Sequence, residues 1–206
     1  MGPQLKEFLS TLKQIDTVVE IGANNGEDSE ILFNLFNPSK FIAIEPDPHN
    51  IEILKSRLLN RLPILLISAA ICDKDSIMDF YLSDAGDCLG SSSSLRKPKE
   101  HLRHFPHVKF PKTIQVKTFR LDTVLSELGI SKVDFIWMDV QGAELDVLKG
   151  CDLNDVHYIC TDIFDDGELY EGMCNSTEFI EYLGPNWKLI YRMGVDFVFE
   201  NLKFGE

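Results

Sequence analysis

Short apolar runs alternate along this chain with segments whose apolar residues recur every three or four positions. The runs predict buried β-strands, and the helical period between them predicts amphipathic helices. The predicted strands cover residues 17–21, 41–44, 64–71, 133–138 and 158–161. A helix within residues 1–15 precedes them and is expected to pack at the sheet edge. Strands that alternate with helices favour an α/β fold with one parallel sheet and right-handed crossovers.

Further apolar runs predict strands outside this alternation. Residues 187–192 and 195–199 predict an antiparallel hairpin that closes the sheet, and additional strands are expected at 77–82 and 113–118. The run at 64–71 is apolar on both faces, which is typical of a central parallel strand.

A long polar segment, residues 83–112, contains Gly86, Gly90 and four consecutive serines. Structureless segments of this length are uncommon inside compact domains and are usually functional, so we expect a substrate lid. Downstream, Asp122 is expected to cap the helix that ends near Gly129.

The first predicted strand runs straight into a glycine-hinged turn. Gly22 and Gly26 flank Asn24 and Asn25, and a predicted helix follows. Glycine lets the backbone turn tightly and lets a ligand come close, while the helix start offers N–H groups to an anionic group. A dinucleotide fingerprint places glycines at its first, third and sixth positions, whereas these two lie four apart. With Glu20 at the strand end to meet positive charge, the layout favours a site for S-adenosylmethionine (SAM) over an ordinary strand-to-helix turn.

Acidic residues end most of the predicted strands. Glu20, Glu45, Asp139 and Asp162 hold these positions, and Asp73 lies just beyond the third strand. Ligands of open parallel sheets bind outside the carboxyl ends of the strands, and charged residues are costly to bury, so we expect the acids to line one site. Glu45 is the candidate for the ribose hydroxyls, with a solvated strand-end acid as the alternative. Asp73 either faces the adenine edge or belongs to a turn.

Composition narrows the class of protein. The chain has 206 residues, 44% of them apolar, which suits a single domain over residues 1–206. Its 33 acidic and 20 basic residues give a formal net charge of −13, which disfavours nucleic acid as a substrate because phosphates are repelled. The five cysteines show no zinc-site spacing, no secretory signal is visible, and no apolar run is long enough to span a membrane. We therefore expect a cytoplasmic protein.

Several motifs, in this order along the chain, resemble the FkbM family of SAM-dependent methyltransferases. They are Val19-Glu20-Ile21-Gly22-Ala23-Asn24-Asn25-Gly26, Ile44-Glu45-Pro46, Ser92-Ser93-Ser94-Leu95, Arg120-Leu121-Asp122-Thr123, Met138-Asp139-Val140-Gln141-Gly142-Ala143-Glu144 and Leu148-Lys149-Gly150. The resemblance covers residues 18–182. It implies a Rossmann-like class I methyltransferase fold, with a mostly parallel seven-stranded sheet, a terminal antiparallel hairpin and helices on both faces. It also implies O-methylation of a hydroxyl on a sugar, a glycan or a secondary metabolite.

Candidate catalytic residues follow the fourth strand and lie in the long segment. Asp139 is expected beside the methyl-donating sulfur, where its carboxylate can orient or deprotonate the acceptor hydroxyl. Glu144, in the first turn of the next helix, is either a substrate contact or a capping acid. His101, His104 and His107 recur every three residues. His104 is the candidate base among them, and solvated lid histidines are the alternative.

A metal site is a further hypothesis. Distantly similar sugar and catechol O-methyltransferases hold a magnesium ion with acids at the ends of strands four and five. Asp139 and Asp162 occupy the analogous ends here, and their hard oxygen atoms suit Mg²⁺. The family usually carries Glu where this chain has Asp162, a shorter arm that would suit a metal or a differently placed acceptor. Tyr170 either walls the acceptor pocket or packs on the core.

Two other functions stay open at this level. An NAD(P)-dependent oxidoreductase on a related sheet is disfavoured by the glycine spacing. A non-catalytic SAM-binding protein that keeps the fold is disfavoured because Glu20, Glu45 and Asp139 are all present.

Overall fold

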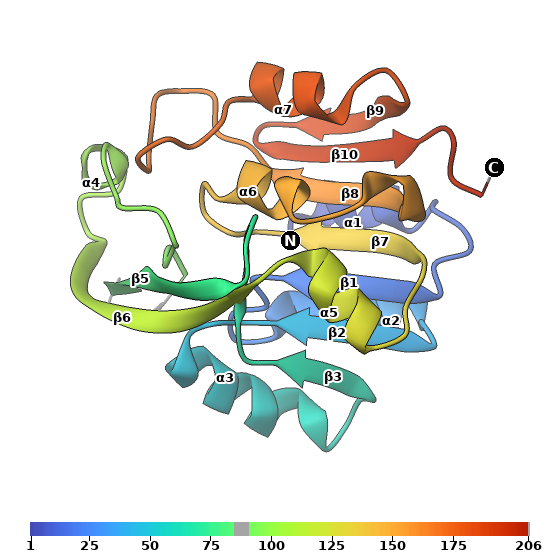
Figure 1. Ribbon diagram of the computed structural model, residues 1–206, viewed down its shortest axis with the longest axis horizontal. Helices are drawn as coiled ribbons and strands as arrows, with labels where there is room; N and C mark the ends of the chain where they lie inside the picture. The colour runs from blue at the N-terminus through green and yellow to red at the C-terminus, as the bar shows by residue number, and fades with distance from the viewer. Residues whose placement is uncertain (85–90, 206) are drawn as a thin grey trace.

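The computed structural model describes residues 1–84 and 91–205. Strands of one seven-stranded sheet follow the order β3-β2-β1-β7-β8-β10-β9 (Figure 1). Their bounds are β1 Thr17–Ile21, β2 Lys40–Ile44, β3 Ile64–Ile67, β7 Val133–Met138, β8 Val156–Asp162, β9 Trp187–Met193 and β10 Asp196–Asn201. Within this sheet, the neighbouring strands β3, β2, β1, β7 and β8 pair in parallel, whereas β10 runs antiparallel to both β8 and β9. The predicted α/β fold with a mostly parallel sheet and a closing hairpin is confirmed.

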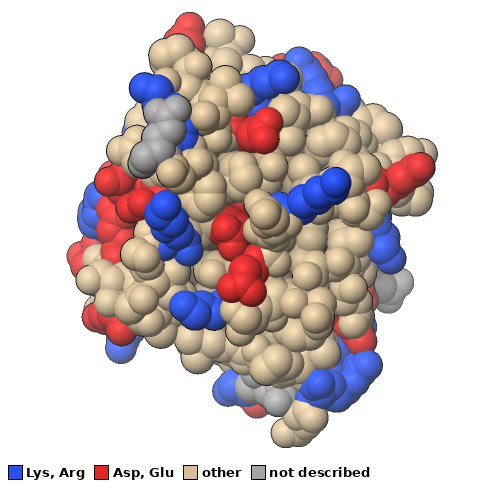
Figure 2. All heavy atoms as spheres, turned by 90° about the vertical axis from the view of Figure 1, so that its right-hand side faces the viewer, with Lys and Arg blue, Asp and Glu red and all other residues tan. Residues whose placement is uncertain are grey.

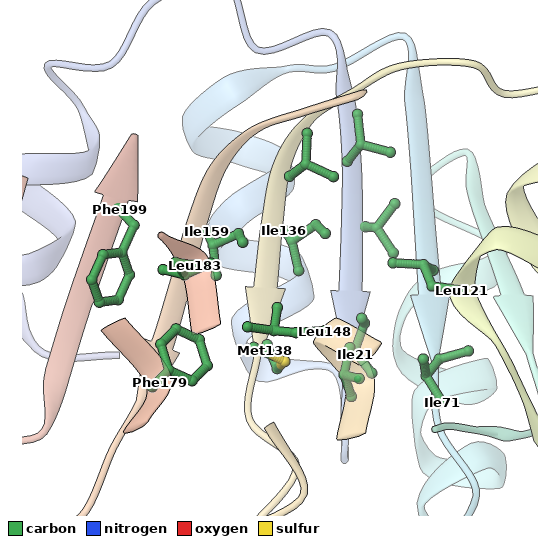
Figure 3. Close-up of a cluster of buried hydrophobic side chains, with 14 of the residues drawn as sticks. Ile21, Ile71, Leu121, Ile136, Met138, Leu148, Ile159, Phe179, Leu183 and Phe199 are labelled. Atoms are coloured by element: carbon green, nitrogen blue, oxygen red, sulfur yellow. The ribbon is translucent and has the colours of Figure 1, made fainter. Parts of the chain in front are cut away.

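Helices cover both faces of this sheet, as expected (Figure 1). One face carries α1 Pro3–Leu9, α2 Glu27–Phe36 and α3 Pro48–Leu54, which continues into the π-helical turn Lys55–Leu59; the other carries α5 Leu121–Glu127, α6 Glu144–Lys149 and α7 Ser176–Leu183. Alternate residues of β7 enter the two cores: Phe135 packs with the first group of helices, and Ile136 with the second. Figure 3 shows the second core, where Leu148 and Phe179 approach the strand side chains.

The N-terminal helix lies on a face of the sheet and not at its edge. Leu5 and Leu9 of α1 are fully buried, in a cluster with Val18 and Val198 from the strands. Burial of each leucine contributes about 2 kcal/mol of transfer free energy. The apolar stripe of this helix therefore faces the sheet interior, which its periodicity alone could not locate.

The prediction of one continuous strand over residues 64–71 was wrong. Residues Ile64–Ile67 form β3 at the edge of the main sheet, where Leu65 is 46% exposed, so the strand is not central. Pairing with β2 stops at Ile67, opposite the last residue of β2. Beyond it, β4 Ala70–Ile71 pairs with a different strand, β6. An apolar run shows that a segment is buried, but it does not show that one partner strand continues along it.

A second, three-stranded sheet contains both ends of the segment expected to be a loop. Its order is β4-β6-β5, with β5 Ser76–Asp84 and β6 Lys109–Phe119. Both strands extend further into residues 83–112 than expected, and the short helix α4 His101–His104 lies between them in sequence. Figure 1 shows β5, β6 and α4 beyond the carboxyl ends of the parallel strands. Gly86, Cys88 and Gly90 lie outside the described residues.

Asp122 does not cap α5 as expected. The helix begins after Arg120, whose guanidinium donates to Asp122 Oδ2 at 2.7 Å. Asp122 Oδ1 accepts the N–H of Asp152 at 2.7 Å. The carboxylate therefore ties the start of α5 to the segment after α6, a long-range contact that a helix-end motif cannot indicate.

Figure 2 shows the right-hand side of Figure 1, where basic and acidic side chains are interspersed. Within the described residues, no helix has the length and apolar character that crossing a bilayer requires.

Candidate functional site

Three hollows open at the carboxyl ends of the parallel strands, and Asp139 lines all of them. The apolar cavity is lined mainly by Ile44, Glu45, Pro46, Ala69, Ile71, Phe80, Leu95 and Val140. The polar cavity is lined mainly by Glu20, Gly22, Asn24, Asn25, Asp28, His49 and Asn50. The aromatic cavity is lined mainly by His101, Phe105, Gln141, Glu144, Asp162, Phe164, Tyr170 and Met173. Asp139, directly after β7, therefore stands where the three meet.

The turn between β1 and α2 separates the apolar and polar cavities. Gly22 has φ +87°, and a Cβ there would lie 2.0 Å from the carbonyl oxygen of Asp139. Gly26 has φ +80°, and a Cβ there would lie 2.8 Å from a methyl carbon of Leu58. Both conformation and space thus require glycine at these positions. Asn24 also takes a positive φ, which asparagine tolerates better than most residues.

Glu45 lies at the end of β2 with its side chain buried. Its two carboxylate oxygens accept the N–H groups of Asn24 and Asp47, each at 2.8 Å. Burial raises the pKa of Glu45 to about 7, although these hydrogen bonds act in the opposite direction. Each oxygen keeps a second lone pair, so the carboxylate can also accept two hydroxyl groups from a ligand in the apolar cavity.

Glu20 is fully buried at the end of β1. One carboxylate oxygen accepts the hydroxyl of Ser29, and the other has no hydrogen-bond partner among the described residues. Burial raises the pKa of Glu20 well above its ordinary value. An unpaired buried acceptor costs about 1–3 kcal/mol, so this oxygen suits a donor or a positive charge brought by a ligand.

The remaining predicted cofactor residues divide between the cavity walls and the surface. Asn25 lines the polar cavity, and its side-chain oxygen accepts the N–H of Glu27 at 3.1 Å. Asp73 is exposed in the turn before β5 and is absent from the residues that line the three hollows. In the described part of the chain, Ile71 and Phe80 line the apolar cavity instead. The adenine contact of Asp73 stays a prediction.

A hydrogen-bonded chain holds the carboxylate of Asp139. Gln141 Nε2 donates to Asp139 Oδ1 at 2.6 Å, and the hydroxyl of Tyr170 lies 3.0 Å from Gln141 Oε1 and 2.7 Å from the carbonyl oxygen of Ser92. Gln141 has φ +54°, a strained conformation that is found at sites where surrounding structure imposes it. Burial raises the pKa of Asp139.

Two further carboxylates stand beside Asp139 in the aromatic cavity. Glu144 is buried, accepts the N–H of Gly142 at 3.0 Å, and has its pKa raised by burial to about 7. For Asp162, burial together with the nearby charges of Asp139 and Asp196 raises the pKa to about 8. Like charges held this close in a water-poor site favour shared protons or a bound cation.

The predicted magnesium site has two candidate ligands in one cavity. Among the described residues, no group of three or more His, Cys, Asp or Glu side chains could hold a metal ion. Asp139 and Asp162 alone leave most of the six positions of Mg²⁺ to water and substrate. The donor set is therefore a poor fit, and magnesium dependence stays a prediction.

The structure separates the three histidines. His101 is 2% exposed and lines the aromatic cavity, with its ring against Phe105, Phe110 and Tyr170. Its Nδ1 has no hydrogen-bond partner among the described residues, and burial lowers the pKa of His101. His104 packs edge-on against Phe164 and is not among the described residues that line this cavity. The role of His104 as a base stays a prediction.

Sequence reasoning missed two contributors to the site. Phe80 faces the apolar cavity from β5, and only the alternation of apolar residues along that strand hinted at a buried face. The contact between Gln141 and Tyr170 joins residues 29 positions apart, which no local motif encodes. Tyr170 is where the pocket-wall interpretation placed it, and it is also almost fully buried.

Comparisons with known proteins agree with this geometry. The family model described as the methyltransferase FkbM domain matches residues 20–179. The 2-O-methyltransferase NoeI of Sinorhizobium fredii is 35% identical over 191 residues, which are 90% of this chain and 78% of NoeI.

Solved structures show the same fold. The methyltransferase FkbM from Methylobacillus flagellatus superposes with a TM-score of 0.59 at 15% identity, covering 92% of this chain. This chain spans only 45% of that protein. An O-methyltransferase from Bacillus cereus, solved with S-adenosylhomocysteine (SAH), gives a TM-score of 0.52 at 14% identity, covering 97% of this chain and 80% of its own. On the family match and the similarity to NoeI, the chain belongs to the FkbM family of SAM-dependent methyltransferases.

Proposed function

We propose that this protein transfers the methyl group of SAM to a hydroxyl oxygen of a sugar, either on a glycan or on a glycosylated secondary metabolite. The observation that carries the proposal is the position of Asp139, which lines the two cofactor cavities and the acid-rich aromatic cavity at once. The 35% identity with a protein named as a 2-O-methyltransferase supports oxygen as the methylated atom.

The residues of the apolar and polar cavities fit SAM. Ile71 and Phe80 offer an apolar slot for the adenine ring, and Glu45 offers two acceptor oxygens for the ribose hydroxyls. The unpaired oxygen of Glu20 suits the positively charged amino-acid end. When bound, SAM supplies an electrophilic methyl group on a positively charged sulfur.

The chain itself supplies alignment and a proton acceptor. The Asp139 carboxylate, fixed by Gln141, is proposed to hold the acceptor hydroxyl and to take its proton as the oxygen is methylated. A pKa raised by burial makes this carboxylate a stronger base than a solvated aspartate. Glu144 is proposed as a second contact to the acceptor. The walls around them exclude water and align the two reactants.

The test is transfer of labelled methyl groups from SAM to a panel of glycosides, oligosaccharides and nucleotide sugars. We expect a labelled methyl ether on a sugar hydroxyl. Asp139→Asn should lower turnover by about 10²–10⁴-fold, the usual contribution of general acid–base catalysis, while SAM still binds. Asp166→Asn, an exposed acid outside the cavities, is the matched control. Label that appears only on nitrogen or carbon, or full turnover by Asp139→Asn, would contradict the proposal.

Three companion predictions have separate tests. Activity that survives exhaustive EDTA treatment would exclude a role for Mg²⁺ at Asp139 and Asp162. Calorimetry with SAM and with NAD⁺ should show binding of SAM alone, as the glycine spacing predicts. We also propose a cytoplasmic location, since the four described cysteines are free thiols, which suits a reducing compartment; fractionation of the native cell tests it.

A further inference from the structure

The aromatic cavity combines several acidic side chains with an absence of basic ones. Asp139, Glu144 and Asp162 line it, and no Lys or Arg does so in the described part of the chain. Residues 85–90, which lie outside that part, contain one aspartate and no Lys or Arg in their sequence. A ligand in this hollow therefore meets acidic side chains without a basic side chain in the described walls. The ammonium of Met1, which acts on Asp139 and Asp162 from the adjoining polar cavity, is paired with Asp28 at 3.0 Å.

Three basic residues of the segment before α4 are already engaged by acids. Arg96 pairs with Asp146 at 2.7 Å and also donates to the carbonyl oxygen of Glu171 at 2.9 Å. Lys97 pairs with the carboxylate of Glu171 at 3.2 Å, and Lys99 pairs with that of Glu168. These contacts direct the positive charges of the segment before α4 to the outer loop, so they do not attract an anion into the hollow.

The other walls suit a ring that has both an apolar face and hydroxyl groups. Phe105, Phe164 and Tyr170 supply aromatic surface, which packs against the C–H face of a sugar ring. His101 is almost fully buried and lines the same hollow, and its Nδ1 finds no hydrogen-bond partner in the described part of the chain. A neutral imidazole can either donate to or accept from a hydroxyl group. Its pKa is lowered by burial and by His104 and His107, so the ring carries no charge to offset the acids at neutral pH.

We infer that the aromatic cavity selects a glycosyl unit without an anionic group and rejects uronic acids and sugar phosphates. This inference rests on the proposed sugar O-methylation and adds the charge of the acceptor to it. An anionic group within about 5 Å of these carboxylates would be repelled strongly, because the water-poor site screens charge weakly. Burial, together with the neighbouring acids, raises the pKa of Glu144 to about 7 and that of Asp162 to about 8. The repulsion is therefore fully developed only at a pH above these values.

Matched acceptor pairs test the inference directly. p-Nitrophenyl hexosides of gluco, galacto and manno configuration would each be compared with the corresponding uronide, which differs by one carboxylate. We expect kcat/KM for the uronide to be at least about tenfold lower at pH 9, above the raised pKa values of Glu144 and Asp162, for every configuration that is methylated. Saturation-transfer NMR on the SAH-loaded protein should show binding of the hexoside and weaker binding of its uronide.

A charge variant links the discrimination to this cavity. At pH 9, Asp162→Asn should raise the uronide-to-hexoside ratio of kcat/KM by about tenfold, whereas Asp166→Asn, in the exposed loop after β8, should leave it unchanged. Use or binding of a uronide as good as that of its hexoside would overturn the charge inference and leave sugar methylation intact. Failure to bind or methylate any sugar in the panel would overturn the proposed function and this inference with it.

Discussion

The cofactor half of the site, formed by the apolar and polar cavities, is built differently from the acceptor half, formed by the aromatic cavity. Half of the described residues that line the two cofactor cavities come from the turns after β1 and β2, within residues 20–50. The acceptor half is assembled from residues 91–105, 139–144 and 162–173, joined by contacts distant in sequence. On the proposed function, local turns would hold the methyl donor, whereas contacts between loops would shape the pocket of the acceptor.

The two halves also differ in the interactions that fix their walls. In the cofactor half, backbone geometry at two glycines and buried carboxylates define the walls. In the acceptor half, the loops are tied by hydrogen bonds such as Lys99 N–H to Leu169 O and Glu171 N–H to Lys97 O, each at 2.8 Å. We therefore expect substitutions in the first half to affect folding and SAM binding, and those in the second to affect turnover.

The largest expected effect comes from Gly22→Ala. Its Cβ would overlap the carbonyl oxygen of Asp139 at 2.0 Å, so the first turn must separate from the end of β7. We expect SAM binding to be lost. The unfolding free energy should fall by clearly more than the ~1–2 kcal/mol that a positive φ alone costs a residue other than glycine. Gly129→Ala has a positive φ and no heavy atom within 4 Å of its Cβ, so it serves as the control. Calorimetry measures SAM binding, and urea denaturation measures the unfolding free energy. If Gly22→Ala and Gly129→Ala lower the unfolding free energy equally, the close contact with Asp139 is contradicted.

The next effect is a dependence of stability on pH. Glu45 and Glu144 have folded-state pKa values of about 7, above those of an unfolded chain. Their contribution to stability is therefore fully present below about pH 4.5 and is lost as the pH rises to about 7. We expect the unfolding free energy without ligand to fall by a few kcal/mol across this window. Glu45→Gln and Glu144→Gln should each flatten part of the profile, and a flat wild-type profile in urea titrations would refute the raised values.

A smaller effect is expected for Glu45→Gln on the cofactor itself. The amide keeps one acceptor oxygen but loses charge and one acceptor facing the apolar cavity. SAM affinity should fall by about 10–100-fold, the range for charge-assisted hydrogen bonds to hydroxyls. Glu52→Gln, an exposed acid in the helix that follows, should bind SAM normally. Isothermal titration compares the two, and unaltered affinity in Glu45→Gln would remove this carboxylate from the ribose site.

The smallest effect is expected for Tyr170→Phe. Loss of the hydroxyl frees Gln141 and Ser92 from one partner, at a cost of about 1 kcal/mol. Because Gln141 then holds Asp139 less firmly, kcat should fall severalfold and the pH–rate profile should shift, while SAM affinity stays constant. Tyr182→Phe, which is 42% exposed, provides the comparison. If Tyr170→Phe is less stable but keeps the wild-type pH–rate profile, the hydroxyl of Tyr170 has a structural role only.

Sequence patterns brought together more of the residues that line the proposed cofactor half than of those that line the proposed acceptor half, for a physical reason. A strand end, a glycine turn and a helix start occupy neighbouring positions, so Glu20, Gly22 and Glu45 could be placed from local spacing. The adenine side was harder, since Phe80 reaches its cavity through a second sheet whose pairing the sequence does not show. Asp73 was also singled out from its position after a predicted strand, but in the structure it lies exposed in its turn.

The histidines show the same limit on the acceptor side. Their spacing drew attention to residues 101–107, yet it could not say which ring faces inward. That outcome depends on Phe110 and Tyr170, which enclose His101 from other parts of the chain. The fold itself was accessible because period and length distinguish helices from strands, and the strands predicted over 17–21 and 133–138 have the bounds of β1 and β7. The break after Ile67 could not be predicted from the sequence, because it depends on where the neighbouring strand β2 ends.

The contact between Gly22 and the backbone of Asp139 restricts how enzymes of this shape can diversify. With no space between the two crossover turns, neither can be lengthened or rebuilt without disturbing the other. New acceptor preferences must therefore arise in the outer loops, at residues 91–105 and 164–173. Libraries that randomise those loops and leave the inner edge intact should yield altered specificity more often than libraries aimed at the strand ends.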